Sequence, residues 1–402
     1  MAHGEREKMN QRQCVLIVGV EFNNQGAFLM MAAAIRQIRT RFNAVPVLEF
    51  NNGTETKRRS VGAYSLLPYQ VLRLFDHRVV SAAYSLLGRL PVVKKLRRVF
   101  PWVTSREVVA VFDASGFCYG DQWVNEPLNT RASRLEYWKS CGVPVYLLPQ
   151  AYGPFEQTSN VSLRALGSAR MVMPRDPDSL EYVLRLTSGS DKFDGRVLPY
   201  PDFTVGLEVS DSNIPVELIG RVPIVPNWNI LERSKPAHGE KYIDHLEEVI
   251  RHLEGRGYLT YGMCHEGVGD RNILRQLAKR LGTQFDFPIV DGADGVQLKA
   301  LIAEAPFIVS GRYHAIVSAL SQSVPAVMHG WSHKYEHLAA EYRCKELICD
   351  PLAEPNESIR IIGRLIEDAT ISARLSQCAE IVRERNAEMW NSIQADLASN
   401  AN

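Results

Sequence analysis

The sequence Phe307–Glu336, FIVSGRYHAIVSALSQSVPAVMHGWSHKYE, gathers apolar runs, a turn and several charged or aromatic residues in one short stretch. Its first apolar run, Phe307–Val309, stops at Ser310 and Gly311, and the apolar residues that follow are spaced as in a helix. The next apolar run, Val324–Met328, is typical of a buried strand in a parallel sheet. The stretch therefore predicts a strand–helix–strand unit.

Arg312 and His314 lie in the turn between the predicted strand and helix. This turn belongs to the carboxyl edge of a parallel sheet, where the free N–H groups of a helix N-terminus favour anions. A guanidinium offers paired donors to a carboxylate or phosphate, and an imidazole exchanges a proton near neutral pH. The pair indicates chemistry on an anionic substrate, although a structural hydrogen bond or ion pair explains the same residues about equally well.

The polar, aromatic segment Gly330–Glu336 follows the second strand and is expected at the same sheet edge. Two of its residues, His333 and Lys334, carry or acquire positive charge. They either add charge to the site or are solvated loop residues.

Length and composition limit the class of protein. A chain of 402 residues usually forms two domains. Lys and Arg total 46 against 45 for Asp and Glu, so overall charge gives no case for nucleic acid binding. The seven cysteines lack metal-ligand spacing and are expected to be reduced thiols of a cytoplasmic protein without a metal site. We expect no signal peptide and no membrane-spanning segment, because no apolar run approaches the roughly 20 residues required.

The first half of the chain alternates apolar runs with helix-like segments. Cys14–Val20 is typical of a buried strand, and the loop after it places Asn24 and Gly26 where amide and backbone donors can meet a ligand. This loop has no GxGxxG pattern, which argues against a dinucleotide. A later strand, Val108–Phe112, ends at Asp113 and Ser115, which are expected in a ligand-facing turn.

Two further candidates follow later strands of this half. Gln150 comes after the strand Val143–Leu148. Arg175 comes after the strand beginning at Met171 and directly before a helix capped by Asp176 or Asp178, which makes it a second anion-binding candidate.

The second half repeats the alternation after a polar segment, Gly206–Arg221, that is typical of a linker. Val222–Val225 and Leu259–Cys264 are predicted strands, with a loop over 226–242 between them. The turn and helix after the second strand place His265, Glu266 and Asp270 at the sheet edge. We predict an N-terminal Rossmann-like domain over 1–206 on the acceptor side, a C-terminal one over 222–370 on the donor side, and a helical tail over 371–402 that crosses back. The predicted fold is α/β, with two such domains facing across a cleft as in GT-B enzymes.

Residues 57–106 form an insert in the first half that is rich in basic and large apolar residues and has few acidic ones. Such a mixture suits a surface that lies on an anionic membrane. A pair of core helices with solvated basic faces explains it slightly better for most of the stretch.

Across both halves, the ordered motifs resemble those of the polysaccharide pyruvyl transferases. They are NNQGA from Asn23, DASGF from Asp113, LLPQAYGPF from Leu147, PRDPDS from Pro174, YPDF from Tyr200, HEGVGD from His265 and SGRYHAIVSAL from Ser310, followed by VPAV and Lys334. Two positions depart from the family pattern. Ala27 stands where many members have an acidic residue, and Asp113–Ser115 replaces a common glycine run.

The resemblance implies transfer of pyruvate from phosphoenolpyruvate to two sugar hydroxyls as a cyclic ketal, with no cofactor or metal. Its anion-binding residues map to Arg175, Arg312 and His314. The other expected substrate-binding residues are Asn24, Gly26, Asp113, Ser115, Gln150, His265 and Lys334. The expected partners are phosphoenolpyruvate, a sugar or lipid-linked oligosaccharide acceptor and, by the basic insert, an anionic membrane at its inner face.

The chemistry of the residues fits this donor. Phosphoenolpyruvate carries a carboxylate and a phosphate, which two arginines and a helix N-terminus can bind. Proton delivery to its methylene carbon requires an acid, and a histidinium is suitable. Two alternatives remain open: a glycosyltransferase that uses a nucleotide-activated sugar, and a non-catalytic glycan-binding relative.

Overall fold

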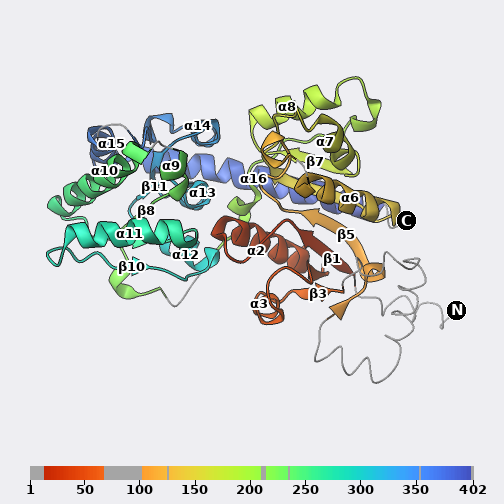
Figure 1. Cartoon of the computed structure of the whole chain (residues 1–402), viewed down its shortest axis with the longest axis horizontal. Coiled ribbons are helices and arrows are strands. Elements are labelled where there is room, and N and C mark those ends of the chain that lie inside the picture. The colour runs from red at the N-terminus through yellow and green to blue at the C-terminus, as the bar shows by residue number, and fades with distance from the viewer. Residues whose placement is uncertain are drawn as a thin grey trace. The chain divides into compact units, whose positions relative to one another are not determined.

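A computed structural model of the chain describes residues 13–67, 102–124, 126–209, 214–233, 236–352 and 355–399. The chain forms two compact units (Figure 1). Unit 1 comprises the described parts of residues 1–22, 30–200 and 388–402, and unit 2 comprises those of 23–29 and 201–387. Each unit is a parallel sheet with helices, which confirms the predicted α/β class.

The sheet of unit 1 has the strand order β4-β3-β2-β1-β5-β6-β7, and every described pairing in it is parallel. Its strands are β1 (Cys14–Val18), β2 (Val45–Glu49), β3 (Tyr64–Leu66), β4 (Trp102–Val103), β5 (Val108–Asp113), β6 (Val145–Gln150) and β7 (Met171–Pro174). Its helices are most of α2 (Gln25–Thr40), then α3 (Glu55–Ser60), α6 (Glu126–Ser140), α7 (Ser159–Leu166) and α8 (Pro177–Thr187). The strand order reverses between β1 and β5, and ligands of such sheets bind beyond the carboxyl ends of strands at that point.

The sheet of unit 2 has the order β10-β9-β8-β11-β12-β13 and is also parallel throughout its described pairings. Its strands are β8 (Val222–Val225), β9 (Thr260–Met263), β10 (Ile289–Val290), β11 (Ile308–Ser310), β12 (Ala326–His329) and β13 (Ile348–Cys349). Its helices are α9 (Trp228–Arg233), α10 (Pro236–Gly255), α11 (Gly267–Leu281), α12 (Gly295–Ala303), α13 (Tyr313–Leu320), α14 (His333–Glu341) and α15 (Asn356–Glu367). The predicted strand–helix–strand unit is β11-α13-β12, with Ile308 paired to Ala326 and Ser310 to Met328.

Helix α16 (Thr370–Ser399) is shared by the two units. Its first part buries Leu375 and Val382 in the core of unit 2. Its last part, from Glu388, belongs to unit 1, where the Trp390 ring lies 5.8 Å from that of Phe112 and the Tyr146 hydroxyl donates to Asp396 at 2.6 Å. The predicted return of a terminal helix to the first half is therefore confirmed.

Three segments that the sequence analysis describes have different outcomes in the structure. The polar segment 226–242 contains helices rather than a loop, because Asn227 accepts a hydrogen bond from the Asn229 N–H at the start of α9 and Ile230 is buried. The described parts of 206–221 cluster with unit 2 and include a short 3₁₀ helix, Val216–Leu218. Of the basic insert, residues 68–101 lie outside the described part of the chain.

At the described start of the insert, Lys57 and Arg59 are exposed and Arg58 is buried. Arg58 on α3 is buried, and its guanidinium donates to Ser65 Oγ at 2.8 Å and to the carbonyl oxygen of Phe50 at 2.8 Å. Its Nη2 also lies 3.2 Å from Glu55. Because Arg59 pairs with Glu55 at 2.9 Å as well, two of the basic residues here have a carboxylate partner.

Candidate active site

Arg312 and His314 lie where the sequence predicts them, at the turn between β11 and α13. Arg312 is the N-cap residue of the helix, and His314 follows in its first turn. The turn is fixed through the Gly311 carbonyl oxygen, which accepts from Asn227 Nδ2 at 2.6 Å and from the Tyr335 hydroxyl at 2.7 Å. A side chain at Gly311 would press on Ile230 and Asn227, at 2.9 and 3.0 Å from its Cβ. The backbone of unit 2 thus holds these two side chains at the carboxyl edge of its sheet.

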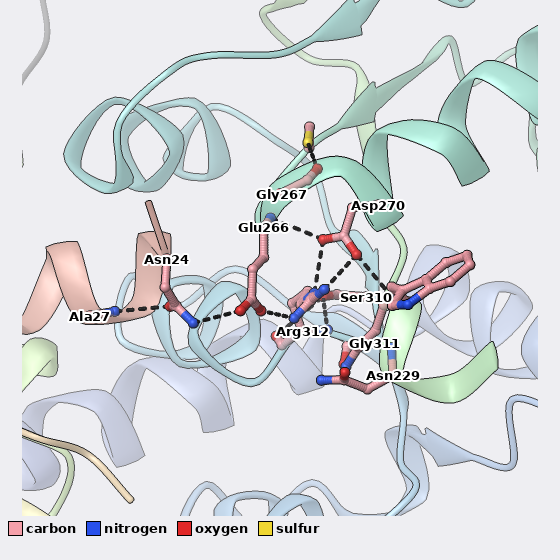
Figure 2. A network of polar contacts seen from close by, with 12 residues as sticks. Asn24, Ala27, Asn229, Glu266, Gly267, Asp270, Ser310, Gly311 and Arg312 are labelled. Carbon is pink, nitrogen blue, oxygen red and sulfur yellow. Dashed lines mark hydrogen bonds and ion pairs between the residues drawn. The ribbon is translucent and has the colours of Figure 1, made fainter. Parts of the chain in front are cut away.

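Arg312 is buried and ion-paired (Figure 2). Its Nε donates to Asp270 Oδ2 at 2.9 Å and its Nη2 to Asp270 Oδ1 at 2.5 Å, while Nη1 bonds to Glu266. Burial opposes the charge of Arg312, but Asp270 and Glu266 together raise its pKa above the ordinary value. Burial also raises the pKa of Asp270 against the opposing effect of Arg312. The guanidinium is therefore a permanent cation with two carboxylate partners.

The two carboxylates differ in exposure. The Asp270 side chain is 0% exposed and also accepts from the Trp228 N–H at 2.9 Å and the Glu266 N–H at 3.0 Å. The Glu266 side chain is 37% exposed. Asp270 is therefore the fixed partner of Arg312, and Glu266 is the one that an incoming anion can replace.

Asn24 joins the same network from the start of α2. Its Nδ2 donates to Glu266 Oε1 at 2.8 Å, and its Oδ1 accepts from the Ala27 N–H at 3.1 Å (Figure 2). Asn24 therefore caps the helix and fixes Glu266, so that a single chain of contacts runs from Asn24 through Glu266 to Arg312. The sequence places Glu266 and Asp270 at this sheet edge, and their i, i+4 spacing puts both on one helix face, but it does not predict that they pair with Arg312.

His314 lies between an acidic residue and a glycine. Its Nε2 is buried and lies 3.5 Å from Asp202 Oδ2. On its other side is Gly26, where an added Cβ would lie 2.3 Å from His314 Nδ1. Gly26 is thus required as glycine by the position of the imidazole.

His265 lies at the end of β9 and is buried. Burial, together with the charges of Arg312 and His314, lowers the pKa of His265 well below its ordinary value. This imidazole is therefore neutral at physiological pH. It can exchange hydrogen bonds with a ligand but adds no charge.

Lys334 is the cation nearest the start of α14. Its ammonium lies 4.8 Å from the ring centre of Trp331, 5.3 Å from that of Tyr335 and 5.4 Å from that of Tyr313. Three aromatic rings stabilise and orient a charge that is half-buried. Tyr313 also contacts His314 edge to face, at 5.4 Å between ring centres, which connects Lys334 to the histidine.

Four predicted residues belong to unit 1. Asp113, at the end of β5, is completely buried and accepts from the Ser115 N–H at 3.0 Å and the Tyr119 hydroxyl at 2.6 Å. Arg131 of α6 lies 3.7 Å from Asp113 and also bonds to Ser115. Asp113 thus organises the turn, and Ser115 and Arg131 are the more exposed members of this group.

Gln150 and Arg175 are neighbours at the ends of β6 and β7. Gln150 is the last residue of β6 rather than part of a turn after it, because the strand runs two residues further than predicted, and Arg175 directly follows β7. The Arg175 N–H donates to the Gln150 carbonyl oxygen at 3.1 Å. Gln150 is completely buried, whereas Arg175 is half-buried and immediately precedes Asp176, which caps α8 by accepting from the Ser179 N–H at 2.8 Å. Arg175 therefore lies next to a helix N-terminus, as predicted.

Metal sites and membrane-spanning helices do not occur among the described residues. No group of three or more His, Cys, Asp or Glu side chains among them is placed to hold a metal ion. In the same part of the chain, no helix has the length and apolar character that crossing a bilayer requires.

Solved structures with a similar fold include UDP-GlcNAc 2-epimerase from Neisseria meningitidis bound to UDP-GlcNAc, with a TM-score of 0.57, 12% identity and coverage of 95% of this chain and 100% of that chain. A putative UDP-N-acetylglucosamine 2-epimerase from Listeria monocytogenes has a TM-score of 0.61 and 11% identity, with coverage of 96% of this chain and 97% of that chain. Phytolacca americana UGT2 complexed with UDP-2fluoro-glucose and pterostilbene has a TM-score of 0.52 and 12% identity, with coverage of 96% of this chain and 99% of that chain. At this identity the likeness shows the fold alone, which is the GT-B type.

Sequence comparison gives the family. No curated protein matches the sequence. The model of the polysaccharide pyruvyl transferase family matches residues 24–333, a range that begins at Asn24 and includes Arg175, Arg312 and His314. Because this range is most of the 402 residues, the chain belongs to the polysaccharide pyruvyl transferase family.

Proposed function

We propose that the protein transfers pyruvate from phosphoenolpyruvate to two hydroxyls of a sugar, forming a cyclic ketal and releasing phosphate. The observation that carries this proposal is the grouping of a titratable histidine, His314, with the cations Arg312 and Lys334 around one helix start in unit 2. Family membership supports the sugar as acceptor. The location that suits this donor is the cytoplasm.

His314 is the proposed acid. Its imidazolium donates a proton to the methylene carbon of phosphoenolpyruvate, and positive charge develops at the adjacent carbon. One sugar hydroxyl attacks that carbon, phosphate leaves with the electrons of the C–O bond, and a second hydroxyl closes the ring. One of the two hydroxyl protons leaves with the phosphate, and the other returns to the histidine. The enzyme therefore ends in its starting form.

Lys334 and Arg312 are the proposed partners of the donor's negative charges in unit 2. The rings of Trp331, Tyr335 and Tyr313 orient the ammonium of Lys334, which is the proposed partner of the donor's phosphate or carboxylate. Arg312 reaches the donor by exchange, with the donor's carboxylate taking the place of Glu266 on Nη1. Arg175 remains the predicted anion-binding residue of unit 1, and Arg175→Lys is expected to weaken use of the donor, because lysine lacks paired donors.

The test is phosphate release from phosphoenolpyruvate in the presence of a panel of glycans that carry neighbouring hydroxyls, both free and lipid-linked. We expect acceptor-dependent phosphate release and a ketal-bearing product in the mass spectrum. His314→Gln is expected to retain donor binding while turnover falls by about 10²–10⁴.

The controls separate this function from its rivals. Transfer of a sugar from a UDP-sugar to the same glycans, without phosphate release from phosphoenolpyruvate, would instead establish a glycosyltransferase. Glycan binding without turnover of either donor would establish a binding protein. A folded His314→Gln protein with nearly normal turnover would contradict the role of His314.

A further inference from the structure

Asp202 is a buried carboxylate with each oxygen in a defined environment. Its side chain is 3% exposed and lies at the start of the 3₁₀ helix Phe203–Gly206. Oδ1 accepts from the Thr204 N–H at 3.0 Å and from the Thr204 hydroxyl at 2.6 Å. Because two donors hold Oδ1, the carboxylate has one orientation, and Oδ2 points to His314 Nε2 at 3.5 Å.

A buried lysine supports the same segment. Lys299 of α12 is 1% exposed, and its ammonium donates to the Thr204 carbonyl oxygen at 2.8 Å. Burial lowers the pKa of Lys299 to about 8, while Asp202 opposes this effect. Lys299 is thus still largely charged at neutral pH, and the nearby carboxylate of Asp202 helps to keep it so.

The two nitrogens of His314 therefore have different surroundings. Nε2 is buried and makes no hydrogen bond among the described residues, and Asp202 Oδ2 lies 3.5 Å from it, so a small shift of the ring would let it donate to this oxygen. Nδ1 lies close to Gly26, where an added Cβ would be 2.3 Å from it, so this nitrogen adjoins backbone and no acidic side chain at that position. A carboxylate that accepts from one nitrogen of an imidazole fixes which tautomer the neutral ring adopts.

We propose that Asp202 is the positioning residue of His314: it holds Nε2–H and leaves Nδ1, beside Gly26, as the atom that exchanges a proton with the substrate. This assignment adds a positioning residue to the proposed function. Only its predicted effect on turnover rests on that function. The orientation of the ring is a property of the protein alone, so it can be tested without any substrate.

The first experiment measures the tautomer of His314 by NMR of protein labelled with ¹⁵N-histidine. The chain has 10 histidines, and the signals of His314 are those that disappear in His314→Gln. We expect the neutral ring to carry its proton on Nε2. A neutral ring with its proton on Nδ1 would overturn the proposal.

The second experiment uses Asp202→Asn. Because the Thr204 donors keep an oxygen at the Oδ1 position, the amide nitrogen takes the position of Oδ2 and donates toward Nε2. We expect the proton of the neutral ring to move to Nδ1. In the transfer assay, kcat is expected to fall by about 10²–10⁴ with little change in KM, as when a catalytic histidine is held in the wrong tautomer.

Asp368→Asn is the matched control. Asp368 accepts from the Thr370 N–H at 2.9 Å and from the Thr370 hydroxyl at 2.6 Å, which repeats the pattern of Asp202 and Thr204. Within the described part of the chain it makes no hydrogen bond or ion pair with a histidine. This variant is expected to leave the His314 tautomer and kcat unchanged. An unchanged tautomer in folded Asp202→Asn would overturn the positioning role, whereas a changed tautomer in a protein without activity on phosphoenolpyruvate would retain that role and refute the proposed function.

Discussion

At the scale of single residues, Arg312 carries a charge that two carboxylates already oppose. Glu266 is the more exposed of the two, and it competes with any anion that approaches Nη1. We expect Glu266→Gln to lower the KM for phosphoenolpyruvate by about two- to fivefold, since a part-exposed ion pair supplies up to about 1 kcal/mol. Initial rates of phosphate release measure this change.

Glu240→Gln is the control for Glu266→Gln. Glu240 is also an exposed partner of an arginine in unit 2, Arg280, and among the described residues it forms no ion pair with Arg312. The Glu240→Gln variant is expected to leave the KM for phosphoenolpyruvate unchanged. An unchanged or raised KM in Glu266→Gln would make Arg312 a structural residue rather than a donor ligand.

Glu341 gives a prediction for stability against pH. Burial raises its pKa from 4.5 to about 7, although Arg385 opposes the shift. Because the folded-state pKa lies above the unfolded one, the stability that Glu341 contributes is present below pH 4.5 and is lost as pH rises to about 7. This loss amounts to at most about 3 kcal/mol.

Glu341→Gln removes this titration. We expect the unfolding free energy of the variant to rise relative to that of the unchanged protein as pH increases from 4.5 to 7, as measured by urea denaturation. Glu336→Gln, at an exposed position on the same helix, is expected to follow the unchanged protein. Parallel pH profiles for Glu341→Gln and the unchanged protein would show that Glu341 ionises normally.

Sequence patterns located some of these residues and not others. Arg312 and His314 were predictable because an apolar run that ends at Ser310 and Gly311 marks the end of a strand. The partners of Arg312 and His314 were not, because Asp270 and Asp202 come from other elements, and only the fold brings them into contact. A cation at a helix start looks the same in sequence whether or not buried carboxylates pair with it.

At the scale of elements, α16 is the helix on which the order of unit 1 depends. Trp390 is buried against Phe42 and Phe112, with ring centres 6.2 and 5.8 Å away. We expect Trp390→Ala to reduce the stability of unit 1 by about 3–5 kcal/mol, the usual loss for a large aromatic residue in a core. Hydrogen exchange of β5 and β6 amides, read by mass spectrometry, measures this change within unit 1.

Ile381→Ala is the control on the same helix, because Ile381 is 48% exposed. Exposed substitutions usually change stability by less than about 0.5 kcal/mol. In Trp390→Ala, amide hydrogen exchange that accelerates equally in unit 2, or that does not accelerate in β5, would contradict the assignment of the last turns of α16 to unit 1.

Long apolar runs made most strands predictable, and short or polar elements were missed. Strands β3, β4, β10 and β13 have two or three residues each, too few for a periodic pattern. Helix α9 was predicted as a loop because its sequence, WNILER, is short and largely polar; the buried contacts of Ile230 and the capping by Asn227 decide it instead.

At the scale of the whole molecule, the near balance of charge conceals a basic stretch. Lys94, Lys95, Arg97 and Arg98 lie in it, outside the described residues. If the stretch meets an anionic bilayer, replacing all four with glutamine is expected to release the protein from anionic vesicles, because each basic residue contributes about 1 kcal/mol at such a surface. Cosedimentation measures binding. High salt should have the same effect, neutral vesicles should bind neither protein, and binding that persists after the substitutions would exclude this surface.

The division of α16 between the units affects how the protein folds as it is made. This helix leaves the ribosome after every described strand of both sheets, yet it supplies Trp390 and Asp396 to a sheet whose first strand begins at Cys14. The described strands of unit 2 are complete before unit 1 receives its last helix. A nascent chain that stops short of Trp390 therefore exposes the apolar face around Phe112, which is the kind of surface that chaperones and proteases recognise.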